Sequence, residues 1–348
     1  MDNILFLNNT VKECGIYQVG LRISRVLNTS TKFNFIYEEV NSEQNLRAWV
    51  QIHQPKVLFF NYQHEVMPWL TTRILKEFES LKPTSITHAY LTPGSEFNQF
   101  SYYISGDTGA KDDFKDFPNI WVMGRVLLDY TGEYPVNKLP TFGTSGFGRR
   151  LKNHPYLVKR VNDEYDKAVI RLHVPYGHYT DHNEENEVIA ACKKEVTKPG
   201  IELQIETEFY EDDYKVLEFL AGNDLNIYAY VPFAPGCGTA SSIDLALSVK
   251  RPVAVSYTNW FRHLRDLTPS IVIENNSLRT LLANGTKPLE PVYKLWTKEN
   301  YLKTIEDIFE EIIAKPAPHT IVDQTIPQKL GLPLPYAALP ASMIDKYV

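Results

Sequence analysis

The chain has 348 residues, of which 43% are hydrophobic and 22% are charged, and these proportions exclude wholesale disorder. Its 36 Lys and Arg residues against 42 Asp and Glu residues leave a formal net charge of −6, which disfavours broad binding to nucleic acid or to an anionic membrane. At about 150 residues per domain, this length predicts two domains, each with a sizeable core.

Cysteine usage and apolar runs indicate the compartment. The three cysteines, Cys14, Cys192 and Cys237, have no paired spacing, so we expect no disulfide framework and no zinc site. No apolar run approaches the roughly 18 residues of a membrane helix, and the first residues lack the pattern of a signal peptide. We therefore expect a cytoplasmic protein with no membrane span.

Strand-length apolar runs alternate with stretches of helical period from the beginning of the chain. Strands are expected at residues 4–7, 33–37, 56–60 and 85–91, with helices at 16–27 and 43–53. This order predicts half of a parallel, nucleotide-binding sheet. The polar stretch 106–118 predicts an exposed loop, and the glycine and prolines within 131–140 predict a linker between domains.

The alternation starts again beyond this linker. Six strands are expected at 139–143, 168–174, 201–207, 225–231, 252–256 and 271–273, and five helices at 155–165, 184–196, 212–221, 242–249 and 297–314. The predicted fold class is α/β, with two Rossmann-like domains, 1–134 and 135–315, facing across a cleft. The Pro-rich tail 316–348 is expected to pack back on the body.

Ligands of open parallel sheets bind beyond the carboxyl ends of the strands, so the loops there are the candidate sites. The first such loop, residues 8–20, carries Gly15 just before a helix whose free N–H groups suit an anion or a sugar hydroxyl. It is no P-loop, because Leu21 and Arg22 follow Gly20. An ordinary strand-to-helix turn is an equally open interpretation.

The second loop, residues 143–152, combines three glycines with Arg149, Arg150 and Lys152 directly after a strand. Backbone N–H groups of such a loop cradle phosphate oxygens while the cations neutralise charge, so we predict a diphosphate site. The alternative is a flexible loop with solvated cations.

The third loop, residues 232–244, opens a helix and carries two glycines and two residue types suited to a helix N-cap, Thr239 and Ser241. Its Gly236-x-Gly238-x-x-Ser241 pattern lacks the third glycine of a dinucleotide fingerprint, and no acidic residue ends the next strand. These two departures disfavour a dehydrogenase.

Histidines and one carboxylate follow strands of the first domain. His64, His88 and Glu96 are candidates for hydrogen bonding to a sugar hydroxyl or for proton transfer. The alternative for each histidine is a satisfied structural role. The histidines at 173, 178 and 182 fit no metal-ligand spacing, and we expect them in a polar loop.

Several short segments occur in the order found in one enzyme family. They are Cys14-Gly-Ile-Tyr-Gln, Tyr62-Gln-His-Glu, Ile86-Thr-His, the glycine-rich loop ending at Lys152, and Pro235-Gly-Cys-Gly-Thr-Ala-Ser-Ser-Ile-Asp followed by Arg251-Pro-Val-Ala-Val. Over roughly residues 1–315 the chain thereby resembles the two-domain (GT-B) nucleotide-sugar glycosyltransferases, most closely retaining family 4. Pro235 replaces the family's usual glutamate, and Asp244 stands near the position of a second one.

The resemblance implies transfer of a sugar from a nucleotide-diphosphate sugar to a glycan or other hydroxyl acceptor, metal-independent and with retained configuration. No Asp-x-Asp motif is present, since Asp212 and Asp213 are adjacent, and no cofactor is expected. The catalytic candidates are His88, Lys152 and Arg149. The substrate-binding candidates are Gly15, His64, Gly146, Phe147, Phe209, Gly236, Cys237, Gly238, Thr239, Ser241 and Asp244.

Two alternatives share this architecture. A nucleotide-sugar epimerase needs no acceptor, and a non-catalytic nucleotide- or sugar-binding relative would explain Pro235. A transferase acting on DNA bases is disfavoured by the net charge and by the lack of a long basic stripe.

Overall fold

The computed structural model of the chain describes residues 1–88, 100–114, 119–179, 181–231 and 239–315. The candidates Glu96, Gly236, Cys237 and Gly238, and the tail 316–348, lie outside the described residues. The described chain forms two compact units, and the chain passes from the first to the second between Val126 and Leu127.

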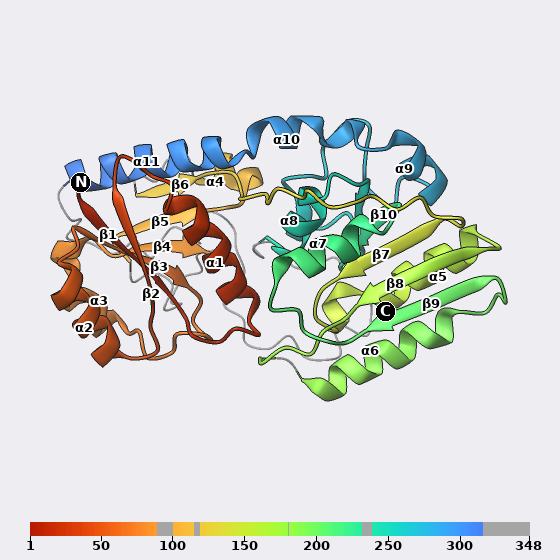
Figure 1. The fold of residues 1–348 in the computed structure, drawn as a ribbon, viewed down its shortest axis with the longest axis horizontal. Helices are drawn as coiled ribbons and strands as arrows, with labels where there is room; N and C mark the ends of the chain where they lie inside the picture. The colour runs from red at the N-terminus through yellow and green to blue at the C-terminus, as the bar shows by residue number, and fades with distance from the viewer. Residues whose placement is uncertain (89–99, 115–118, 180, 232–238, 316–348) are drawn as a thin grey trace. The chain divides into compact units, whose positions relative to one another are not determined.

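The first unit is built on a parallel sheet with the strand order β2-β1-β3-β4-β5-β6 (Figure 1). Its strands are β1 (Asn3–Asn8), β2 (Asn34–Glu39), β3 (Val57–Tyr62), β4 (Thr84–Thr87), β5 (Tyr102–Ser105) and β6 (Ile120–Val122). Its α-helices are α1 (Gly15–Leu27), α2 (Glu43–His53), α3 (Thr72–Glu77), α4 (Lys111–Phe114) and α11 (Lys298–Ala314). The apolar runs of β1 and β3 are fully buried, as expected for strands covered by helices on both faces.

The long helix α11 belongs to the first unit, although it comes last in the described chain (Figure 1). The Phe309 ring packs edge-on against Phe35 and Phe59, at centroid distances of 5.6 and 4.9 Å. Lys82 Nζ donates hydrogen bonds to the backbone oxygens of Ile312, Ile313 and Lys315 at the end of the helix. The predicted assignment of residues 297–314 to the second domain was therefore wrong, because the apolar stripe of this helix fits the first sheet.

The second unit has a parallel sheet of order β11-β10-β7-β8-β9. Its strands are β7 (Thr141–Ser145), β8 (Ala168–His173), β9 (Ile201–Glu206), β10 (Leu225–Tyr228) and β11 (Val253–Val255). Its α-helices are α5 (His154–Glu164), α6 (His182–Glu195), α7 (Asp213–Ala221), α8 (Ser242–Ser248), α9 (Leu278–Asn284) and α10 (Glu290–Leu295). The predicted α/β class with two Rossmann-like units is thus confirmed.

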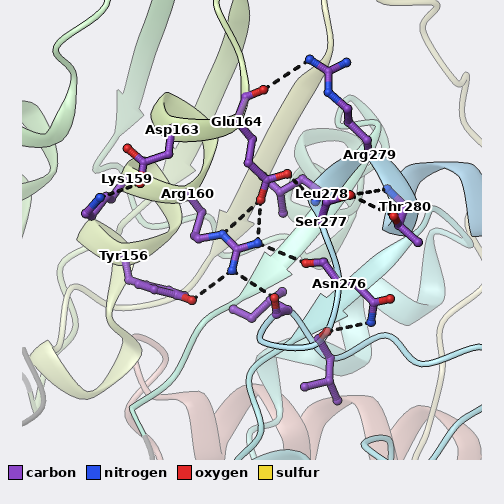
Figure 2. A network of polar contacts seen from close by, with 12 residues as sticks. Tyr156, Lys159, Arg160, Asp163, Glu164, Asn276, Ser277, Leu278, Arg279 and Thr280 are labelled. Atoms are coloured by element: carbon purple, nitrogen blue, oxygen red, sulfur yellow. Dashed lines mark hydrogen bonds and ion pairs between the residues drawn. The ribbon is translucent and has the colours of Figure 1, made fainter.

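Arg160 anchors α5 to the segment that precedes α9 (Figure 2). Its guanidinium donates to the backbone oxygens of Ile273 and Asn276 at 3.0 and 3.1 Å and to Glu164 Oε1 at 2.6 Å. Glu164 Oε2 in turn accepts the backbone N–H of Leu278 at 2.7 Å. These bonds hold α5 in place, and with it the loop that immediately precedes this helix.

Three predictions of local structure were wrong. Residues 131–140 are no linker between units, because Pro135 O and Asn137 bond to Arg251 and Asp224 of the second unit. Residues 271–273 form only a single bridge, between Val255 and Val272, and not a strand. The stretch 106–118, expected as an exposed loop, contains a 3-10 turn at Thr108–Ala110, helix α4 and the buried Asp107.

Among the described residues, no helix is both long and apolar enough to cross a membrane.

Candidate functional site

The carboxyl edge of the first sheet carries a buried network of side-chain amides. Asn8 ends β1 and Asn61 lies in β3, and both side chains are fully buried. Asn61 Nδ2 donates to Asn8 Oδ1 at 2.8 Å and to the backbone oxygen of Ile16 at 2.6 Å. His88, the residue after β4, approaches the same amide, with Nε2 2.6 Å from Asn61 Oδ1. The network thus joins three strand ends.

Gly20 permits this arrangement. A Cβ atom at this position would lie 2.5 Å from Asn61 Nδ2 and 2.6 Å from Asn8 Cγ. Helix α1 therefore approaches the strand ends only because residue 20 has no side chain.

The imidazole of His88 is held neutral. Burial and the nearby positive charge of Arg125 lower the pKa of His88 to about 3. A histidine with this pKa is a poor general base at neutral pH, but it is a competent hydrogen-bonding group.

Arg125 was not among the predicted site residues. It follows β6, is buried, and donates from Nη1 to Thr239 Oγ1 at 2.8 Å. Thr239 belongs to the first unit and is the first described residue after the segment 232–238. The only signal in the sequence was a cation directly after an apolar run, which is too common to single out one residue.

Two other candidates of the first unit lie at the same sheet edge without joining this network. Gly15 begins α1, and its N-cap Cys14 forms no capping hydrogen bond through its side chain. His64 lies half-buried in the turn after β3. The structure thus brings Asn61, not His64, to His88.

In the second unit, the predicted phosphate loop follows β7 with an unusual backbone. Gly146 has a φ of +152° and donates its N–H to His173 O at 2.9 Å. A Cβ atom on Gly146 would collide with Lys152 Nζ. The glycine therefore makes room for the lysine, and this close approach was not predictable from the glycine spacing.

Lys152 is the most perturbed cation at this edge. Its Nζ lies 5.4 Å from the centroid of the Phe147 ring and 5.9 Å from that of Tyr230. Burial and the charge of Arg149 lower the pKa of Lys152 to about 7, although the buried Glu185 opposes the shift. No hydrogen bond or ion pair joins Nζ to another residue in the described part of the chain. A desolvated ammonium group of this kind gains most from an anionic ligand.

The Arg149 side chain is half-exposed, and its Nε lies 4.0 Å from Glu184 Oε2 of α6. Its charge acts on Lys152, so the structure brings these two catalytic candidates together. Arg150 points elsewhere and pairs with Glu187 at 2.5 Å.

The third predicted loop begins beside the second. The backbone N–H of Val231, the last described residue before segment 232–238, donates to Leu151 O at 2.9 Å. Ser241 is the N-cap of α8, as its residue type predicts, but its side chain forms no capping bond. Asp244 is buried in the first turn of this helix.

Aromatic rings lie at the ends of β7 and β9. The Phe147 and Phe209 rings are parallel within 8°, with centroids 6.4 Å apart. His173 was expected in a polar loop, but it is buried at the end of β8 and stacks on Tyr210 at 4.4 Å. Its nitrogens contact Ser145 Oγ at 2.8 Å and Glu208 O at 2.9 Å, so its role is structural.

Among the described residues, no group of three or more His, Cys, Asp or Glu side chains is arranged to hold a metal ion.

No protein-family model matches the chain, and no curated protein matches it by sequence. Solved structures do match. A glycosyltransferase from Rickettsia africae is 11% identical, with a TM-score of 0.62 over 90% of this chain and 98% of that one. A UDP-forming α,α-trehalose-phosphate synthase from Burkholderia xenovorans is 10% identical, with a TM-score of 0.60 over 91% and 100% of the chains.

A third likeness is to HepE of Anabaena, solved with UDP and glucose, which is 12% identical with a TM-score of 0.54 over 95% of this chain and 98% of that one. At sequence identities this low, the similarity to these structures shows a shared fold and no more. The chain has the two-domain α/β fold of the GT-B type, as expected from the resemblance of its motifs.

Proposed function

We propose that the chain is a glycosyltransferase that moves a sugar from a nucleotide-diphosphate sugar to an acceptor hydroxyl, without a metal ion and with retained configuration. The observation that carries the proposal is Lys152, a desolvated ammonium group after β7 in a fold shared with proteins solved with UDP. The second unit would hold the nucleotide, and His88 of the first unit would contact the donor sugar.

The diphosphate would lie against Lys152 and Arg149. An anion beside Lys152 restores the pKa of this amine and favours its charged form. Charge-assisted hydrogen bonds of this type contribute about 1.5–3 kcal/mol each. The same groups stabilise a leaving diphosphate as its charge develops, which is the task of a metal ion in other transferases.

Retention of configuration agrees with the state of His88. Its low pKa makes it unsuited to remove a proton from the acceptor. In the proposed reaction the leaving phosphate accepts that proton while the acceptor oxygen bonds to the anomeric carbon and the carbon–phosphate oxygen bond breaks.

Uridine is the first base to test, because one structurally similar protein is a UDP-forming synthase and another was solved with UDP. We place the base near Phe209, which follows β9 and whose ring is parallel to that of Phe147. A reducing, cytoplasmic location fits Cys14 and Cys192, which are free and buried.

The test is a thermal-shift screen with UDP, GDP, ADP, CMP and dTDP, each with magnesium and with EDTA. We expect one nucleoside diphosphate to stabilise the protein equally in both conditions. Lys152→Ala should abolish the shift. Lys159→Ala, which removes an exposed lysine paired with Asp163 on the following helix, should not. No shift with any nucleotide would contradict the proposal.

A product assay then separates the alternatives. Transfer of sugar only when an acceptor is present supports a transferase, whereas a changed sugar configuration without acceptor indicates an epimerase. Tight nucleotide binding with no turnover of any donor indicates a non-catalytic relative.

A further inference from the structure

We propose that Asn61 is a positioning residue that fixes the tautomer of His88, so that His88 Nδ1 offers a hydrogen-bond acceptor to a hydroxyl group of the ligand. That this hydroxyl belongs to the donor sugar rests on the proposed function. The tautomer itself rests only on the geometry of the first unit.

The first step is the orientation of the Asn61 amide. One of its two terminal atoms lies 2.6 Å from the backbone oxygen of Ile16, and a backbone carbonyl only accepts hydrogen bonds. The atom facing Ile16 must therefore be the NH₂ group. Asn61 Oδ1 then necessarily faces His88.

The second step is the proton on His88. Asn61 Oδ1 is an acceptor, and it lies 2.6 Å from His88 Nε2, so the ring proton resides on Nε2. A neutral imidazole carries one N–H, and the low pKa of His88 keeps the ring neutral. His88 Nδ1 is consequently a lone-pair acceptor.

The third step is the rigidity of the amide. Asn8, the other partner of Asn61, donates from Nδ2 to the Tyr17 backbone oxygen at 3.0 Å and to the Tyr37 hydroxyl at 3.1 Å. Gly20 brings α1 against both asparagines. A flip of the Asn61 amide would place its oxygen against the oxygen of Ile16, so the network permits one orientation only.

The last step is the partner of Nδ1. In the described part of the chain, no residue donates a hydrogen bond to this nitrogen. A sugar hydroxyl can donate to it, whereas an ether, a carbonyl or an ionised phosphate oxygen cannot. His88 would thus select for a ligand with a free hydroxyl at the contacted position.

The direct test is nitrogen NMR of ¹⁵N-histidine-labelled, ligand-free protein at pH 7, with the His88 signals assigned by their loss in His88→Gln. We expect the Nε2–H tautomer. A dominant Nδ1–H tautomer, or a charged ring, would overturn the proposal. Because this spectrum needs no substrate, it decides the tautomer even if the protein binds no nucleotide and the proposed function fails.

Substitution of Asn61 tests whether this residue determines the tautomer of His88. Asn61→Leu has a similar volume but no acceptor, and we expect mixed tautomers of His88. An unchanged spectrum in a folded Asn61→Leu protein would overturn the role of Asn61. If this variant does not fold, the smaller Asn61→Ala, which also lacks the acceptor, takes its place, and the wild-type spectrum still tests the assignment.

The contact between His88 and a hydroxyl group of the ligand is tested with deoxy analogues of the donor sugar, once a donor is known. For the intact donor, Asn61→Leu should lower kcat/KM about tenfold, the usual effect of one hydrogen bond. For the one analogue that lacks the contacted hydroxyl, the substitution should have almost no effect. An equal loss for the intact donor and for every analogue would mean a merely structural role.

Discussion

Both sheets are parallel, but their strand orders differ, and so do the side chains at their carboxyl edges. In the first unit, Asn8, Asn61 and His88 are neutral and hydrogen-bonded to one another. In the second unit, Lys152 lies among aromatic rings, and no carboxylate pairs with its Nζ in the described residues. On the proposed function, the two edges would recognise different groups, an uncharged hydroxyl in the first unit and an anion in the second.

The physical reason lies in the cost of burial. A buried amide whose donors and acceptors are satisfied costs little free energy, whereas a buried ammonium group without a counter-ion costs much more. Lys152 is partly buried, and the loss of water around its ammonium group lowers its pKa. A bound anion would relieve this cost, so on the proposed function the second edge would gain more from its ligand than the first.

The largest expected effect comes from removing this cation. Lys152→Ala should lower turnover about 100- to 1,000-fold, the magnitude found when a group that stabilises developing charge is lost. Steady-state kinetics would measure it, with Lys159→Ala as the control on an exposed lysine of α5. His88→Ala should also lower turnover strongly while the fold stays intact. Near wild-type rates in both variants would show that Lys152 and His88 are not part of the catalytic site.

The next effect concerns two neutral histidines, His88 of the first unit and His154 of the second. Burial lowers the pKa of His88 to about 3 and that of His154, at the start of α5, to about 4. The unfolded chain takes up protons below about pH 6.5, but the folded chain does not, so stability is lost as the pH falls towards these values. At pH 5 each histidine should cost about 2 kcal/mol.

Urea unfolding at pH 7 and pH 5 would measure this loss. His88→Gln and His154→Gln should each reduce the difference in unfolding free energy between the two pH values, whereas His178→Gln, at an exposed position, should not. If neither His88→Gln nor His154→Gln alters the difference, the acid sensitivity has another origin.

A smaller effect is the pH dependence of ligand affinity at the second edge. Lys152 is about half-charged at pH 7, and an anion raises its pKa, so binding of a nucleoside diphosphate takes up a proton above pH 7. Affinity should therefore fall up to about tenfold per unit as the pH rises from 7 to 9. Calorimetric titration of the diphosphate identified in the thermal screen would measure the slope.

Lys152→Arg is the matched control for that slope, because a guanidinium stays charged over this range. Its affinity should be independent of pH between 7 and 9. The same slope in wild type and Lys152→Arg would assign the proton to another group.

The smallest effect concerns the aromatic pair at the second edge. If the base lies against Phe209, Phe209→Leu should weaken nucleotide binding about fivefold, the lower end of the range for one stacking contact. Binding of inorganic diphosphate should stay unchanged. Equal losses for nucleotide and diphosphate would place the base elsewhere.

Local signals in the sequence were enough for many elements. Helix α2 was predicted at residues 43–53, the bounds that it has, from the helical period of its apolar residues. In the structure Ser42 caps its first turn, and Gln54 ends it in a left-handed conformation. β5 and β6 were missed, since β6 has three residues and both strands flank a polar stretch that indicated a loop. Short strands are specified by their neighbours in a sheet more than by their own residues.

The sequence by itself determined the α/β class, the parallel order of strands and helices, and the loop that carries Lys152, because periodicity and glycine spacing are local properties of the chain. Only the tertiary structure decided that α11 joins the first unit, since that choice depends on the fit of Phe309 between Phe35 and Phe59. It also decided the network of Asn8, Asn61 and His88. Asparagine at a strand end is an ordinary residue, and strands from three separate segments, together with the close approach of α1 at Gly20, place these side chains within hydrogen-bonding distance.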